Sequence, residues 1–383
     1  MIMRNLFSKY KVVTLVFSVI FSGVFSLIEA QVSANKEVGK RNQAYADSLK
    51  NSEYPYILPI WGDKVTKMGI SLPYSAGVSV QYLWQESDII IDNLMVGFNN
   101  NEKYNLDQIV RFNETKSTAN AMNFRPDVWV LPFLNVYGII ATSQLSTIVD
   151  YSIFVPDSLG NSKEAIRLNS KANFNATSFG FGVTPTFAVA GLFVALDMNF
   201  TWNDIPELKK PAFAFVLGPR LGKTFKFKKP ERNIALWVGG FRLKLNSGTE
   251  GSLLMKDVLD LSDLQPKIDA ASIKVDEAYV QVDTWWNNLS PAEQKKPGNI
   301  AKYERANSAI TKADGYVGSL DEALNDSQQA SVQYSLDKRP ANMWNFIVGT
   351  QFQINKHWMI RAEYGFLGTR NQFITGLQYR FGL

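Results

Sequence analysis

Long segments in which apolar and polar residues alternate are the feature that most constrains what this chain can fold into. Segments of about 10 to 13 residues exceed the ~5–6 residues of a typical soluble strand and match the ~9–11 residues that cross a bilayer at a tilt. In lipid every backbone group needs a hydrogen-bond partner, so such strands must close into a barrel. The final segment, 371–383, places on one face Phe373, Thr375, Leu377, Tyr379, Phe381 and Leu383.

The pattern predicts an all-β, transmembrane, antiparallel β-barrel of about 12 strands. An even number brings both ends of the chain to the same side, and 10 or 14 strands fit the same condition. The predicted strands are 65–72, 76–86, 88–98, 121–131, 133–145, 176–189, 192–202, 212–225, 232–246, 342–354, 357–367 and 371–383.

The start of the chain has the three parts of a secretory signal peptide. Arg4, Lys9 and Lys11 precede an apolar run of about 16 residues, and the small residue Ala30 follows. This run is shorter than the ~20 residues of a membrane-spanning helix, which favours cleavage after Ala30. We therefore divide the chain into a signal peptide at 1–30, an N-terminal arm or plug at 31–63, barrel strands at 64–254, a helical insertion at 255–335 and the last strands at 336–383.

The composition excludes several classes of protein. Without cysteine the chain has no disulfide, no lipid-bearing cysteine and no thiolate metal site. Its formal charge of +5 falls to +3 when three basic residues and Glu29 leave with the signal, which is too little to predict nucleic-acid binding. The single histidine, His357, lies in a predicted turn and is badly placed to activate a nucleophile. We expect no enzyme, no cofactor and no metal.

The exported start and the terminal strand resemble the outer-membrane β-barrel proteins of Gram-negative bacteria, the porin-like class. The resemblance runs from about Val65 to the end, apart from the insertion, and it implies a location in the cell outer membrane. In that class the barrel-assembly machinery reads the last strand, so the resemblance implies an assembly signal. The terminal residue of that class is most often aromatic, whereas here it is Leu. The implied signal is Phe373, Leu377, Tyr379, Phe381 and Leu383.

Connections of alternating length predict the orientation. Short connections at 131–134, 189–192, 228–233 and 355–357 alternate with long ones, as periplasmic turns alternate with external loops in such barrels. The long connections are 99–120, 146–171, 203–211 and 247–341.

The insertion has a helical period. Apolar residues recur at spacings of three and four from Ile268 to Leu289 and from Tyr303 to Leu324. Ser290 and Glu293 have the spacing of a capping box, which predicts a break between two helices of an antiparallel hairpin in an external loop. Three interpretations stay open: a self-contained ornament, a contact device for a surface partner, and a lid over the pore.

Polar residues that alternate with apolar ones are expected to line the lumen. They either pair and fill a narrow barrel or form a weakly basic channel, because Arg and Lys rings favour anions. The candidates are Arg125, Asp127, Asp197, Asn199, Arg220, Arg242, Lys244, Arg361, Glu363, Gln378 and Arg380. We expect a passive channel for small polar or anionic solutes; the alternative is a surface interaction or adhesion protein anchored by the barrel.

Overall fold

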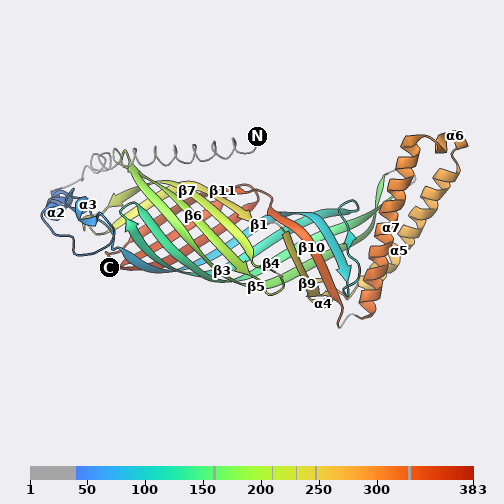
Figure 1. The fold of residues 1–383 in the computed structure, drawn as a ribbon, viewed down its shortest axis with the longest axis horizontal. Coiled ribbons are helices and arrows are strands. Elements are labelled where there is room, and N and C mark those ends of the chain that lie inside the picture. The colour runs from blue at the N-terminus through green and yellow to red at the C-terminus, as the bar shows by residue number, and fades with distance from the viewer. Residues whose placement is uncertain (1–39, 158–160, 209, 230, 246–247, 327–328) are drawn as a thin grey trace, which may run out of the picture.

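The computed structural model shows a closed antiparallel barrel of ten strands (Figure 1). It describes residues 40–157, 161–208, 210–229, 231–245, 248–326 and 329–383, so the predicted signal peptide lies outside the described residues. The last strand pairs with the first and closes the wall. In order around the wall the strands are β1 (Ala76–Phe98), β3 (Val110–Leu131), β4 (Leu134–Pro156), β5 (Ser162–Val189), β6 (Leu192–Asp204), β7 (Ala212–Lys226), β8 (Asn233–Leu245), β11 (Trp344–Gln353), β12 (Trp358–Phe366) and β13 (Arg370–Phe381).

The barrel therefore has ten strands rather than the twelve we favoured from the sequence. The segments 76–86 and 88–98 are one continuous strand, β1, because Ser87, the residue between them, stays paired with both neighbouring strands, opposite Arg370 and Ser117. The weak segment 65–72 is not a strand, and its start belongs to the short helix α3 (Gly62–Thr66). Each correction removes one strand, and because ten is still an even number the two ends of the barrel lie on the same side.

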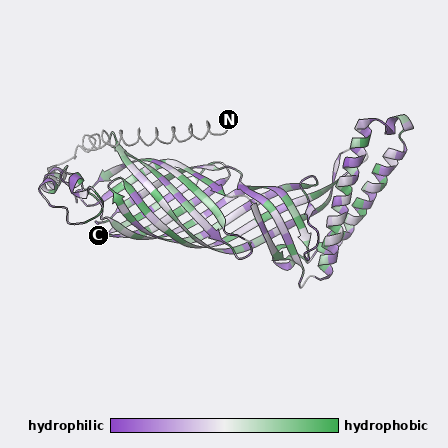
Figure 2. Cartoon of the chain, viewed as in Figure 1, coloured by the Kyte–Doolittle hydropathy of each residue, from purple (hydrophilic) through white to green (hydrophobic). Residues whose placement is uncertain are grey.

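The outer face of the barrel is apolar. Outward side chains such as Ile140, Phe179 and Leu377 are 45–57% exposed, and Figure 2 shows hydrophobic residues recurring along the barrel walls. Phe181, Phe200 and Phe215 of neighbouring strands contact one another on this face, with ring centroids 5.1 Å apart in both contacts. A wall that exposes apolar rings over many strands is suited to lipid and not to water.

Four wall strands continue far beyond the barrel. β1, β3, β4 and β5 have 22–28 residues, whereas β13 has 12 and pairs only with the first half of β1. The second half of β1 pairs instead with β2 (Tyr104–Asn105) and β10 (Ser331–Pro340), and β10 pairs with β9 (Gly248–Leu254). We call this part, outside the ten-strand wall, the extension.

The extension encloses an apolar core of its own. Inward residues of β1 change from polar ones within the barrel to Ile89, Ile91 and Val96 beyond it, and these pack with Ile153 and Ile166 of β4 and β5. The hairpin helices complete this core. They are α5 (Leu264–Asn287) and α7 (Pro297–Asn325), with the short helices α4 (Met255–Val258) before them and α6 (Pro291–Gln294) between them.

The two long helices pack against each other and against the extension. The predicted seam residues Ile268, Val275 and Ile310 are buried, and α5 contacts β5 while α7 contacts β4. Ser290 and Glu293 form the capping box that starts α6. Among the described helices none is both long and apolar enough to cross a membrane. Figure 1 shows the hairpin at one end of the molecule and the chain's C-terminus at the other.

The N-terminal arm covers the end of the barrel that carries the C-terminus. After helix α2 (Lys40–Lys50), the backbone N–H groups of Ile57 and Leu58 donate to the carbonyl oxygen of Leu383 at 2.9 and 3.3 Å. Tyr54, Tyr56 and Tyr74 continue as a series of edge-on ring contacts. The last residue of the chain is therefore tied to the arm.

The first prediction tests the orientation. An epitope inserted after Lys296, in the exposed turn between α6 and α7, should be stained by antibody on intact cells, since the hairpin lies opposite the periplasmic end. The matched insertion after Lys228, in the exposed β7–β8 turn, should be stained only after the outer membrane is permeabilised. The reverse pattern would mean that the barrel is inserted the other way up.

Candidate functional site

Four inward charged residues meet in the middle of the lumen. The Arg220 guanidinium on β7 lies 2.8 Å from a Glu363 oxygen of β12 and 3.2 Å from an Asp197 oxygen of β6. Arg361 lies 3.2 Å from the same Glu363 carboxylate. Residue exposures are 1% for Glu363, 6% for Asp197 and 8% for Arg220. We call these four residues the lumen network. It joins strands that are not neighbours in the wall, since β8 and β11 separate β7 from β12.

Neutral donors complete the network. The Tyr137 hydroxyl donates to Asp197 and lies 2.8 Å from the amide oxygen of Asn199, and the Trp237 indole N–H donates to Glu363 at 2.9 Å. Both rings lie over glycines of a neighbouring strand. A Cβ on Gly182 would lie 2.1 Å from the Tyr137 ring, and one on Gly349 would lie 2.3 Å from the Trp237 ring. These glycines let two large rings enter the lumen beside the buried charges.

A second cluster lies nearer the end of the barrel that carries the C-terminus. Arg380 of β13 pairs with Asp127 of β3 at 3.0 Å across β1, and Gln378 and Asn135 donate to the same carboxylate at 2.7 and 2.8 Å. The Arg125 guanidinium lies 3.8 Å from the centre of the Tyr137 ring. Below the lumen network these residues line a polar cavity of about 490 Å³. Nine of the eleven predicted inward residues thus lie in or beside two bonded groups.

Two of the predicted lumen residues lie on the other face. Arg242 pairs with Leu217 and Lys244 with Phe215, and Phe215 belongs to the outward aromatic contacts. The inward residues of this part of β8 are Trp237 and Phe241. The prediction that Arg242 and Lys244 point inward is wrong because the apolar residues of β8 change faces near its outer end, beyond Gly239 and Gly240.

The sequence analysis missed Tyr137 and Trp237, which hold the lumen network together. Both lie on the inward face of their strands by simple alternation with Asn135 and Ala235. Our prediction assigned charged and polar residues to the lumen and aromatic residues to the lipid face. The position of each aromatic ring on the inward face of its strand is the signal that could have identified these two residues as lumen residues.

The residues of the implied assembly signal lie on the outer face. Phe373, Leu377, Tyr379, Phe381 and Leu383 are each 37–51% exposed. His357 lies in the β11–β12 turn, where its Nδ1 is 2.8 Å from the carbonyl oxygen of Arg380 and its ring stacks on Tyr379. This places the histidine at the same end of the wall as the chain's C-terminus.

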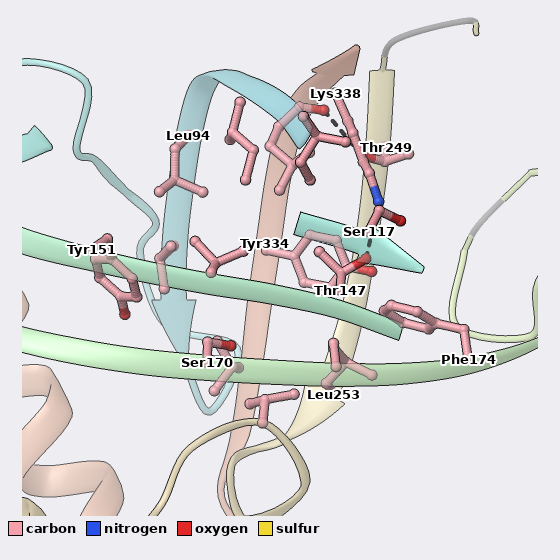
Figure 3. Close-up of a pocket in the computed structure, with 18 of the residues that line it drawn as sticks. Leu94, Ser117, Thr147, Tyr151, Ser170, Phe174, Thr249, Leu253, Tyr334 and Lys338 are labelled. Carbon is pink, nitrogen blue, oxygen red and sulfur yellow. Dashed lines mark hydrogen bonds between the residues drawn. The ribbon is translucent and has the colours of Figure 1, made fainter. Parts of the chain in front are cut away.

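A second cavity, of about 210 Å³, lies in the extension and is lined almost entirely by apolar side chains (Figure 3). Its walls come from β1, β3, β4, β5, β9 and β10. One charged residue, Lys338 of β10, borders it, and its ammonium donates to the Thr147 hydroxyl at 3.0 Å. No pattern singles out this lysine in the sequence, because β10 lies within the predicted loop 247–341.

Comparison with known proteins gives matches in structure only. No family model and no curated protein matches the chain. The chain is similar to the translocator domain of the autotransporter NalP from Neisseria meningitidis, with 8% identity over 92% of this chain and 98% of that one and a TM-score of 0.29. It is also similar to the β domain of the Bordetella autotransporter Brka, with 9% identity over 80% of this chain and 100% of that one and a TM-score of 0.28. For an outer membrane channel from Pseudomonas putida F1 the identity is 8% over 81% of this chain and 96% of that one, and the TM-score is 0.25.

The closed wall, its lipid-suited outer face and its polar interior define a bacterial outer-membrane β-barrel, located in the outer membrane. Outer-membrane lipid surrounds its wall. No subfamily is identified.

Proposed function

We propose that this protein is a surface-exposed interaction protein that uses its barrel as a membrane anchor, and that it is not a passive channel. The lumen network is the observation that carries the proposal. Arg220 joins carboxylates from two sides of the lumen, and both carboxylates accept further hydrogen bonds from rings that fill the same cross-section. A solute crossing the barrel would have to separate buried charge pairs, which is costly at low local dielectric.

The distribution of ordered structure outside the membrane supports the same function. The extension and the hairpin form the main apolar core of the described residues, which gives the protein an ordered body beyond the membrane wall. At the tip of the hairpin the rings of Trp286 and Tyr303 stack with centroids 4.5 Å apart, and Lys302 lies over Trp285. Aromatic and basic side chains of this kind are enriched where proteins contact partners. We propose the hairpin as the contact device and assign no catalysis to it.

Conductance in planar bilayers tests the proposal. Folded wild-type barrels, checked by heat-modifiable mobility in gels, should give no stable open-channel steps. The variant Tyr137→Ala/Trp237→Ala/Arg220→Ala/Glu363→Ala should conduct, because it removes both the two rings and the Arg220–Glu363 ion pair from the lumen. Discrete, long-lived steps from the wild-type protein would restore the passive channel as the better interpretation.

A further inference from the structure

The cavity in the extension has the chemistry of a binding site at one end. Lys338 enters it beside Thr147, and Ser117 and Thr249 lie near the same end (Figure 3). The rest of the lining consists mainly of aliphatic and aromatic residues. They include Ile89, Leu94, Phe112, Leu145 and Phe174.

Lys338 is held there without an anionic partner. No carboxylate of the described ranges forms an ion pair with its ammonium, and its one hydrogen bond goes to a neutral hydroxyl. The neighbouring charges on β10 point elsewhere: Asp337 accepts from Asn93, and Arg339 pairs with Asp92. Desolvation alone lowers the pKa of Lys338 to about 8. An ammonium so placed destabilises the fold unless an anion joins it.

The size of the cavity limits its occupant. At ~10–15 Å³ of solvent-accessible space for each group of water or methylene size, a volume of 210 Å³ holds roughly 14 to 21 such groups. That is enough for one chain of medium length and too little for two. An apolar chain would replace the empty space, and a head group with negative charge would meet the lysine and the hydroxyls.

We propose that this cavity binds a single-chain amphiphile with an anionic head group, of the class of a medium-chain fatty carboxylate. The head group contacts Lys338 and Thr147, and the chain lies among the apolar residues that line the remainder of the cavity. This site is separate from the lumen and goes beyond the proposed function, so a conducting barrel would leave the inference standing.

Protonation of Lys338 gives the site a pH dependence. The other titratable residues of the lining are Tyr151, Tyr316 and Tyr334. Burial raises the pKa of Tyr151 and of Tyr334 to about 12, and it raises the pKa of Tyr316 well above 10. Glu207 borders Tyr334 from outside the lining. Between pH 7 and pH 9.5 only Lys338 among these lining groups changes charge, and it loses its charge as the pH rises through about 8.

The test uses the full chain in phosphatidylcholine nanodiscs and titrates it with decanoate, decanol and decyltrimethylammonium in a calorimeter. At pH 7 decanoate should bind at least about tenfold more tightly than decanol, as a charge-assisted hydrogen bond predicts, and the cation should bind weakest. At pH 9.5 the advantage of decanoate should shrink in the wild-type protein and persist in Lys338→Arg.

Two further variants locate the head and the chain. Lys338→Met should make decanoate and decanol bind equally, whereas the control Lys171→Met, an exposed lysine on the outer face of β5, should change nothing. Ala172→Trp, which fills the cavity from β5, should abolish binding of both. Lys338→Met should also raise the thermal unfolding temperature of the unliganded protein, which shows that it folds. Equal binding of decanoate and decanol by the wild type, or a preference that survives Lys338→Met, would overturn the proposal.

A final arm distinguishes the sources of the ligand. Nanodiscs that contain phosphatidylglycerol should block decanoate if an anionic lipid chain is the natural occupant. Undiminished decanoate binding in the same nanodiscs assigns the site to a free fatty carboxylate. Both results keep the anionic, single-chain chemistry.

Discussion

Replacing Arg220 by Met should destabilise the barrel by about 3–5 kcal/mol, as removal of one partner from a buried ion pair does. The variant leaves Asp197 and Glu363 in a closed lumen without the cation that lies between them. Urea unfolding of the folded barrel in detergent, followed by the loss of heat-modifiable mobility, would measure the change. The midpoint should fall strongly with little change in slope.

Two controls separate the ion pairs from the loss of an arginine. The charge-balanced variant Arg220→Met/Asp197→Asn should recover much of the lost stability, since Glu363 keeps Arg361 and Trp237. Arg167→Met removes an arginine from an exposed pair with Asp150 and should cost less than about 1 kcal/mol. Similar losses for Arg220→Met and Arg167→Met would mean that water enters the lumen freely and that the network does not seal it.

Leu377→Lys should lower the stability of the folded barrel by about 2–4 kcal/mol, whereas Gln378→Lys should change that stability only slightly. Leu377 is 45% exposed on the outer face, where its strand neighbours are Val80 and Ile360. Gln378 faces the lumen and lies 2.7 Å from Asp127, so a cation there gains a carboxylate. Adjacent residues thus have opposite environments.

Folding yields into lipid vesicles and urea unfolding would measure Leu377→Lys and Gln378→Lys side by side. The comparison needs no further control, because both variants add the same side chain to the same strand. Equal tolerance of the two would show that the last strand is not held in the register that the structure gives it.

The alternation of the strands allowed the wall of the barrel to be predicted, because lipid and lumen impose opposite chemistry on successive residues. The outward positions of Phe373 and Leu377 and the inward positions of Asp197 and Glu363 follow from it. The pattern gave no information on which charges meet. Glu363 and Arg220 are 143 residues apart and lie on strands that do not pair, so only closure of the wall brings them together.

The extension could not be predicted for a different reason. Our expectation was that strands end where the membrane ends, so 99–120 and 146–171 were taken as loops. In the structure β3 begins at Val110 and β4 reaches Pro156, because those residues pack in an apolar core instead of facing lipid. A strand that faces lipid and a strand that faces an apolar protein core show the same alternation of apolar and polar residues. The alternation therefore predicts strands in these segments but does not distinguish lipid from protein core as the surroundings of their apolar side.

The continuity of β4 and β5 from the membrane wall into the extension has a mechanical consequence. The two strands stay paired from Leu134 with Pro185 to Pro156 with Ser162, and the hairpin helices pack against their outer ends. A pull on those ends acts along the strands, so many ladder hydrogen bonds resist it together in shear and do not open one after another. Tension applied at the cell surface would thus be carried into the wall of the barrel, and the same wall contributes the carboxylates and arginines of the lumen network.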